Sequence, residues 1–290
     1  MKYKSLISPS EKSLTAIINT DNGQLVGLLQ PSDALDYMHG GGRSEDDYKR
    51  NTAGWPNSEI LMFPIVSASK GNKIVFEGNK YDLDQHGIVR AIKPSISSPQ
   101  DKNDTMDLSY DYESSQPVDN SIRNKKSAES PKTMALPFSF RFTKSHTVND
   151  ALNTVLTIEN TSDAAFSYAL GWHPAFNPLG NSNEGFFFDA AGNRLMCLDS
   201  LVGFTKRDGG LEIFYDGIKY INEKTGEGFK LKSDLGHLML WAPTTDLFCI
   251  EPITEKKEKG TQIDLTPGKS YKNVMMSGHK KTYHVEITPL

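Results

Sequence analysis

The chain of 290 residues lacks several features that would assign it to a particular class of protein. It has only two cysteines, Cys197 and Cys249, too few for a disulfide framework, and each lies in an apolar run where we expect a buried thiol. No apolar run reaches the roughly 20 residues of a membrane span, and the amino terminus has no apolar stretch long enough for a secretory signal. We therefore expect a cytoplasmic protein with no membrane partner.

An excess of charge of one sign is also missing. The net charge is -4 and the pI is near 6.0, with lysines and arginines scattered among the acids. The sequence therefore has no extended basic region that would attract nucleic acid. No HExxH motif or paired CxxC motif is present, so the seven histidines do not predict a metal site. The mean hydropathy of -0.48 is typical of a soluble protein with long polar loops.

The apolar pattern is that of strands. No long stretch repeats apolar residues at i, i+3, i+4 and i+7, whereas short β-branched and aromatic runs recur between turn residues. Residues 152–159 alternate and predict a strand with one wet face, while residues 60–66 are apolar throughout and predict a strand covered on both faces. Pro64 in that run requires a bulge or an unpaired position. We predict an all-β fold, a large antiparallel sandwich of two layers.

Expected strands cover most of the chain. They are residues 14–19, 24–29, 60–67, 73–77, 138–143, 152–159, 166–170, 186–189, 229–232, 237–241, 247–251, 271–277 and 283–288. The polar segment 94–131 retains a strand-like alternation at 106–112, so we interpret it as insertion loops within a single domain, 1–290. Residues 33–58 form another long irregular stretch, of the kind in which binding sites are often built.

The segment Gly-Trp-His-Pro-Ala-Phe at residues 171–176 is the most informative. Pro174 fixes the local chain and donates no amide hydrogen, so it holds His173 in place. We expect Trp172 and Phe176 to flank the imidazole, because aromatic rings stack on the apolar C–H face of a sugar and line sugar clefts. Taken alone, a histidine beside a tryptophan is more often a hydrogen-bonded structural residue.

Residues 84–90 add a second histidine. In an extended chain, positions an even number apart point to the same side, so His86 and Arg90 are predicted to face one cleft. An imidazole exchanges a proton near neutral pH, and an arginine fork binds hydroxyls or carboxylates. The alternative is a turn at Gly87 with a surface arginine.

A carboxylate and a further ring come from the last third of the chain. Glu251 closes an apolar run and is followed by Pro252, so we predict that it is partly buried, which would raise its proton affinity toward that of a useful general base. The alternative is a strand-end glutamate in solvent. Trp241 is expected in the core rather than in the cleft.

Together these segments resemble the aldose 1-epimerase family, the galactose mutarotases and their relatives. The Gly-Trp-His-Pro form is most similar to a divergent bacterial branch often found near lactose genes. The resemblance covers about residue 60 to the carboxyl terminus, and the first sixty residues fit more loosely. It rests on the ordered set Phe63-Pro64, Gln85-His86-Gly87-Ile88-Val89-Arg90, Pro137-Phe138, the strand ending at Asn160, residues 171–176, Ile250-Glu251-Pro252 and Leu265-Thr266-Pro267-Gly268.

The resemblance implies a β-supersandwich with a sugar in a cleft on one sheet face, and it assigns roles. Glu251 would take the proton of the anomeric hydroxyl, and His173 would give a proton to the ring oxygen. His86 would bind and polarise the same region or act as a second acid. The implied substrate is a free monosaccharide such as a hexose, galactose being the family's usual one, and no metal or organic cofactor is needed.

Further substrate contacts implied by the resemblance are Arg90, Trp172, Phe176 and a hydroxyl-binding aspartate, for which we choose Asp216. Relatives specialised for hexose 6-phosphates carry an Arg-Gly-Gly-like run before Phe-Pro, whereas residues 55–60 here contain no arginine, which argues against that branch. The candidates to replace that arginine are Arg43, Lys49 and Arg50. The chain is expected to be a monomer or homodimer.

Two other functions remain open. A sugar-binding or regulatory protein could keep the same scaffold and cleft without turnover. A relative of polysaccharide lyases or glycoside hydrolases would need a second catalytic carboxylate or a tyrosine in the cleft. The test that separates an enzyme from the alternatives is whether His86, His173 and Glu251 converge within hydrogen-bond reach of one bound sugar.

Overall fold

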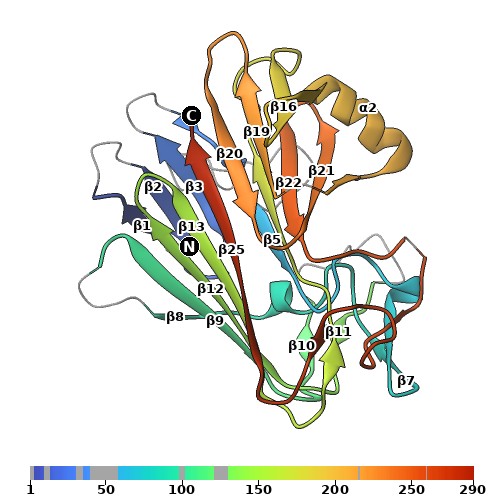
Figure 1. The fold of residues 1–290 in the computed structure, drawn as a ribbon. Helices are drawn as coiled ribbons and strands as arrows, with labels where there is room; N and C mark the ends of the chain where they lie inside the picture. Colours follow the sequence, from blue (N-terminus) through green and yellow to red (C-terminus); the bar gives the residue numbers. More distant parts are fainter. Residues whose placement is uncertain are drawn as a thin grey trace.

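The computed structural model describes residues 3–9, 14–30, 35–39, 58–97, 102–120, 130–214, 216–258 and 260–290. Antiparallel strands dominate these ranges, as the sequence predicts, and two sheets of nine and five strands carry most of them (Figure 1). In the larger sheet, the alternation of buried and more exposed residues gives one face to the core. The predicted all-β antiparallel sandwich is thus confirmed.

The larger sheet is antiparallel throughout. Its two long central strands alternate between buried and more exposed side chains, so one face is committed to the core. In spatial order the strands are β17 (Arg194–Cys197), β16 (Gly185–Asp189), β19 (Gly217–Asn222), β20 (Gly228–Ser233), β25 (Lys280–Pro289), β13 (Leu152–Asn160), β12 (Phe140–Val148), β9 (Thr105–Tyr112) and β8 (Ser95–Ser97).

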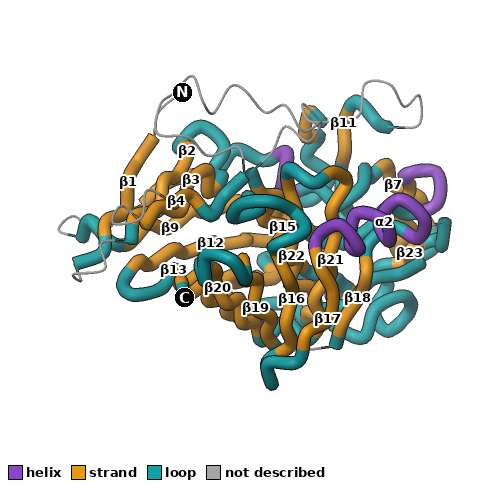
Figure 2. The backbone as a smooth tube through the Cα atoms, turned by 90° about the horizontal axis from the view of Figure 1, so that it is seen from above, coloured by secondary structure: helices purple, strands orange, loops and turns teal. Residues whose placement is uncertain are grey.

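The five-stranded sheet carries the candidate site. In spatial order its strands are β18 (Leu211–Ile213), β21 (His237–Thr244), β22 (Leu247–Ile253), β15 (Gly171–Phe176) and β5 (Glu59–Met62). Figure 2 shows β18, β21, β22 and β15 side by side. We call the face toward the nine-stranded sheet the inner face and the opposite one the outer face.

Aromatic rings fill the space between the two sheets. The ring of Phe248 on β22 lies 4.2 Å from that of Tyr220 on β19, and Phe176 on β15 lies 4.5 Å from Phe229 on β20, measured between centroids. Large aromatic side chains contribute much of the burial in such a core. The inner face of β15 and β22 is therefore closed by aromatic packing.

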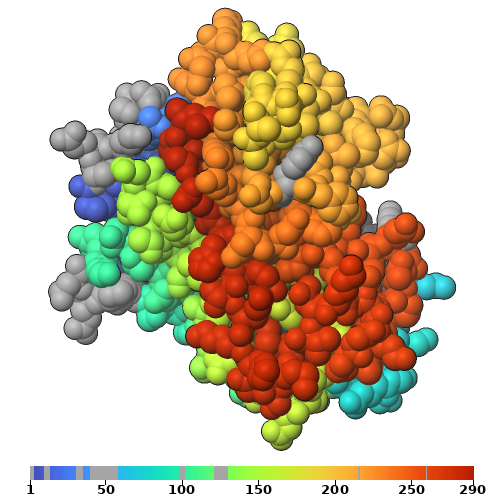
Figure 3. All heavy atoms as spheres, viewed as in Figure 1, coloured from blue at the N-terminus to red at the C-terminus, as the bar shows by residue number. Residues whose placement is uncertain are grey.

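Smaller sheets complete the fold. A four-stranded sheet is formed by β1 (Tyr3–Ile7), β2 (Thr15–Asn19), β3 (Leu25–Gln30) and β4 (Leu35–Asp36), and the short pairs are β10 (Val118–Asp119) with β11 (Thr133–Met134) and β14 (Phe166–Ser167) with β24 (Val274–Met275). A third group joins β23 (Ile263–Asp264), β6 (Lys73–Phe76) and β7 (Asn79–Asp82). In Figure 3 the residues of β6 and β7, coloured cyan, lie against residues near the carboxyl terminus, coloured red, at the lower right.

Helix is scarce in the described ranges. The helix α2 (Leu198–Asp208) was not predicted, because only its first turns bury apolar residues, namely Leu198, Leu201 and Val202. Two short 3-10 turns are η1 (Lys70–Asn72) and η2 (Val89–Ala91). Cys249 is a buried free thiol as expected, whereas Cys197 is partly exposed at the start of α2.

The predicted strand at 60–67 is shorter than expected. It ends at Met62, just before Phe63 and Pro64. A proline cannot donate to a ladder, and here the chain leaves the sheet at that point. Phe63 then forms an isolated bridge to Gly87, which brings the segment around His86 to the end of β5.

Candidate active site

Strand β15 presents its side chains alternately to the two faces. Trp172 and Phe176 point inward, where both are 0% exposed, and Phe176 packs on Phe229 and Phe248 of the core. His173 points outward. The expectation that Trp172 and Phe176 flank the imidazole and contact a sugar is therefore corrected: residues adjacent in a strand project to opposite faces.

Glu251 and His173 meet on the outer face. Strand β22 pairs with β15 so that Gly171 lies opposite Ile253 and Ala175 opposite Cys249, a register that places His173 opposite Glu251. The Nε2 atom of His173 lies 3.3 Å from Oε1 of Glu251, with each residue only 6% exposed. The two residues predicted to carry the chemistry are thus neighbours in adjacent strands.

His86 reaches this pair from a turn. Its ring centroid lies 5.6 Å from that of His173, with the two planes at 85°. His86 and Gly87 both have positive φ, 67° and 79°, so the segment is a turn and not the extended chain that we expected. The amide of Phe63 donates to the carbonyl of His86 and the amide of Ile88 to that of Phe63, which clamps the turn to the end of β5.

The hydrogen bonds of His86 fix its tautomer. Its Nδ1 contacts the backbone carbonyl of Val66, which can only accept, so the proton lies on Nδ1. Its Nε2 is then an acceptor, and it is 3.0 Å from the side-chain nitrogen of Gln85. In the neutral ring, His86 can accept a hydrogen bond from a ligand hydroxyl through Nε2 once Gln85 moves aside.

Arg90 lies in η2 and is held by a buried carboxylate. Its Nη2 is 3.1 Å from Oδ2 of Asp84, which also accepts hydrogen bonds from Asn120 at 2.7 Å and Ser130 at 2.8 Å. The guanidinium Nε is buried without a hydrogen-bond partner among the described residues. A buried unsatisfied donor is uncommon, and it marks a position that a ligand can satisfy.

Burial sets the protonation of the site. It raises the pKa of Glu251 to about 8, opposed by the positive charge of Lys256. Burial also lowers the pKa of His173 well below its usual value, with the charges of His86 and Arg90 adding to the effect. For His86, burial and then Arg90 lower the pKa to about 4. Near pH 7 these shifts favour two neutral imidazoles and one protonated carboxyl at the site.

An aromatic ring beside His173 is that of Trp241. Strand β21 places it on the outer face opposite Cys249, where it is partly exposed. Its ring lies 5.9 Å from that of His173, with the planes at 78°. Our expectation of a core tryptophan is corrected, since the core side of this part of β21 is taken by Leu240 and Ala242.

Asp216 lies away from this arrangement. It is exposed in the turn before β19, and its backbone carbonyl accepts a hydrogen bond from Ser233. The strand that follows it, β19, belongs to the nine-stranded sheet, whereas His173 and Glu251 lie on strands of the five-stranded sheet. The hydroxyl-binding role chosen for it has no support here. The other candidates, Arg43, Lys49 and Arg50, lie outside the described residues.

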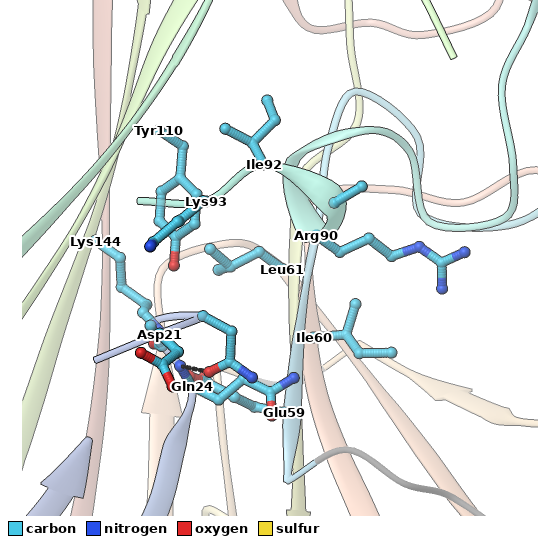
Figure 4. A pocket seen from close by; sticks show the side chains of 13 residues that line it. Asp21, Gln24, Glu59, Ile60, Leu61, Arg90, Ile92, Lys93, Tyr110 and Lys144 are labelled. Atoms are coloured by element: carbon cyan, nitrogen blue, oxygen red, sulfur yellow. Dashed lines mark hydrogen bonds and ion pairs between the residues drawn. The ribbon is translucent and has the colours of Figure 1, made fainter. Parts of the chain in front are cut away.

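A buried charge pair lies beneath the site, on the inner face. Glu59 of β5 accepts hydrogen bonds from the ammonium of Lys144 and the indole N–H of Trp172, and both side chains of the ion pair are 1% exposed. Burial lowers the pKa of Lys144, opposed by Glu59. Figure 4 shows the pair at a cavity of about 280 Å³ that Tyr110 also lines.

Neither His173 nor Glu251 lines that cavity, because it lies on the other side of β5. Its lining residues come from β5, β9, β12, the β2–β3 turn and η2 with the residues that follow it. The pair on the outer face, and not the cavity, brings titratable groups within reach of one another. We therefore place the candidate active site on the outer face.

The described part of the chain lacks two features. No three His, Cys, Asp or Glu side chains there converge so that they could hold a metal ion. None of the helices in that part combines the length and apolar character needed to cross a membrane.

Comparison with known proteins identifies the family. The aldose 1-epimerase family matches residues 9–207, and the chain belongs to that family. No curated protein gives a significant match.

Solved structures agree in fold across the whole chain. A galactose mutarotase-like protein from Lactobacillus casei has a TM-score of 0.73 at 16% identity, covering 99% of this chain and 100% of its own. A galactose mutarotase related enzyme from Lactobacillus acidophilus has a TM-score of 0.71 at 16% identity, covering 100% and 97%. An aldose epimerase homologue from C. elegans has 0.69 at 14%, covering 100% and 99%. At these identities the likeness shows the fold alone.

Proposed function

We propose that this protein is an aldose 1-epimerase that interconverts the α and β anomers of a free aldose. The observation that carries the proposal is the contact of 3.3 Å between His173 Nε2 and Glu251 Oε1, with the ring of His86 beside it. Opening a sugar ring requires one group to take a proton and another to give one, and the contact between His173 and Glu251 supports these two roles for them.

The pair shares one proton, and the reaction uses both of its forms. Transfer of the proton from Glu251 to His173 gives a carboxylate and an imidazolium. The carboxylate takes the proton of the anomeric hydroxyl, the imidazolium protonates the ring oxygen, the C1–O5 bond breaks and C1 becomes an aldehyde. This returns a protonated Glu251 and a neutral His173, the state that burial favours.

Closure on the other face gives the second anomer. Rotation about C1–C2 turns the aldehyde, after which Glu251 returns its proton to the carbonyl oxygen and His173 takes the proton of the attacking hydroxyl. His86 accepts a hydrogen bond from a sugar hydroxyl through Nε2, Arg90 donates through Nε, and Trp241 stacks on the sugar's apolar face.

The test is mutarotation of freshly dissolved α-glucose and α-galactose, followed by polarimetry or anomeric NMR. We expect acceleration over buffer, and a loss of about 10²-fold or more in the Glu251→Gln and His173→Asn variants. Glu227→Gln, which alters a partly exposed carboxylate in the turn between β19 and β20, is the matched control and retains the activity.

The buffer rate across a panel of aldoses would contradict the enzyme proposal. If the same sugars then bind to the wild-type protein, the result favours a sugar-binding protein on this scaffold. If neither turnover nor binding is observed, both functions are excluded for those sugars.

A further inference from the structure

The outer face of the five-stranded sheet continues beyond the catalytic pair. Register places Met239 of β21 opposite Glu251, and Glu212 of β18 opposite Met239. Because paired residues project to the same face, Glu212 lies on the outer face two strands away from Glu251. Two strand spacings are roughly 10 Å, about twice the width of one pyranose ring.

Around Glu212, two strands away from Glu251, polar side chains gather beside an exposed aromatic ring. Glu212 Oε1 lies 2.7 Å from Nδ1 of His237, and its Oε2 lies 3.6 Å from Nζ of Lys256. The ring of Phe214 packs at 4.7 Å on the imidazole of His237 and is 72% exposed, the most exposed large apolar residue of the described chain. We call these four residues the distal cluster.

The distal cluster has the composition of a sugar-binding subsite. Its three polar side chains are between 22% and 29% exposed, so they are held in place by one another and still reach solvent. They offer a carboxylate acceptor and an ammonium donor to hydroxyl groups. Beside them, Phe214 offers a free aromatic face to the apolar side of a ring.

Lys256 connects this cluster to the catalytic pair. It forms an ion pair with Glu212, and its charge also acts on Glu251. A ligand that binds across both groups would therefore extend along one face of the sheet. The apolar side chain of Met239, which is buried, lies between the distal cluster and the catalytic pair.

We propose that the distal cluster is a subsite for a second sugar ring, so that the preferred substrate is a reducing disaccharide whose free anomeric end lies at His173 and Glu251. This deepens the proposed function and depends on it for turnover. The ring at the reducing end spans the catalytic pair, and the next ring stacks on Phe214 and hydrogen-bonds to Glu212 and Lys256.

The test compares kcat/KM for mutarotation of α-lactose and α-maltose with that for α-glucose and α-galactose. For the wild type we expect a disaccharide-to-monosaccharide ratio of about ten, the scale of one aromatic contact. Phe214→Ala should reduce the ratio about tenfold, whereas Phe214→Tyr keeps the ring and the ratio. Met276→Ala removes another exposed apolar side chain, 50% exposed, and leaves the ratio unchanged.

A wild-type ratio near one, or an equal loss on both sugar classes in Phe214→Ala, would overturn the distal subsite while leaving the epimerase proposal intact. If no sugar is turned over, the epimerase proposal fails and calorimetric binding decides the subsite by itself. Tighter binding of disaccharides that Phe214→Ala abolishes supports it. Equal binding of both classes, or none, overturns it.

Discussion

The indole N–H of Trp172 donates a hydrogen bond to the carboxylate of Glu59, which lies on the adjacent strand β5 and forms a buried ion pair with Lys144. Trp172 directly precedes His173, so the strand that carries the candidate acid is anchored from beneath by a charge pair. Lys144 also donates to the carbonyl of Gly23, 2.8 Å away, in the turn between β2 and β3. The pair therefore connects three sheets behind the site.

Loss of one partner of this pair should destabilise the protein strongly. In Lys144→Met the carboxylate of Glu59 stays buried without its cation, and we expect the free energy of unfolding to fall by about 3–5 kcal/mol. Urea denaturation at pH 7 measures this. Lys280→Met, an exposed lysine of β25, is the control and should cost less than about 0.5 kcal/mol.

The double variant Glu59→Leu with Lys144→Met tests the physical reason. Removing both charges leaves no unpaired ion, so we expect it to recover much of the stability lost in the single variant. A single variant that loses under about 1 kcal/mol, or a double variant that is additive, would show that the pair is hydrated and not buried.

Activity should depend on the single proton shared by His173 and Glu251. Since burial raises the pKa of Glu251 to about 8, the pair loses its proton as the pH rises through that value and no acid remains. We expect kcat/KM for mutarotation to fall about tenfold per pH unit above pH 8. At the acid end, His86 becomes charged near pH 4 and loses its Nε2 acceptor.

A pH series of initial rates in buffers of low catalytic power measures both limbs. An activity that instead rises through pH 8 to a plateau would mean that Glu251 works as an isolated base, with the proton for the ring oxygen coming from elsewhere.

Stability should show the cost of burying the same carboxyl. Glu251 has an ordinary pKa of 4.5 in the unfolded chain and about 8 in the fold, so the unfolded state ionises first as the pH rises. Its contribution is complete below pH 4.5 and is lost progressively up to pH 8, by about 3 kcal/mol at pH 7. Glu251→Gln should remove this part of the pH dependence and melt at a higher temperature than the wild type at pH 8.

Thermal melts of both proteins between pH 5 and 8 measure the difference, with Glu227→Gln as the control at a partly exposed carboxylate. Parallel curves for wild type and Glu251→Gln would contradict the burial argument.

Much of the sandwich could be predicted because its strands alternate with period two. This pattern predicts a strand at residues 152–159, which form most of β13. The same pattern did not reveal the buried charge of Lys144, which occupies a core position of β12 where an apolar residue is normal. A charge at such a position is explained only by its partner on another sheet.

The candidate site was predicted in its residue types and only partly in its geometry. His173, His86 and Glu251 converge, although they are separated by up to 165 positions in the sequence. The predicted position of Trp172 beside the sugar is wrong, because the local sequence does not show which face of β15 is covered by the core. Trp241 and the distal cluster became visible only through the register of β18, β21 and β22.

The turn that presents His86 depends on a glycine, and a second glycine provides its control. Gly87 and Gly78 have nearly the same φ, 79° and 80°. A Cβ at Gly87 would lie 2.0 Å from the carbonyl oxygen of Phe63, whereas one at Gly78 would meet nothing within 4 Å. Gly78→Ala therefore isolates the cost of a side chain at positive φ, about 1–2 kcal/mol.

Gly87→Ala adds a backbone clash, so we expect a larger loss of stability and a displaced His86 turn. Mutarotation should fall at least tenfold in Gly87→Ala and stay near the wild-type rate in Gly78→Ala. Urea denaturation and polarimetry on the two variants decide it, and equal effects of both would show that the clamp to Phe63 does not position His86.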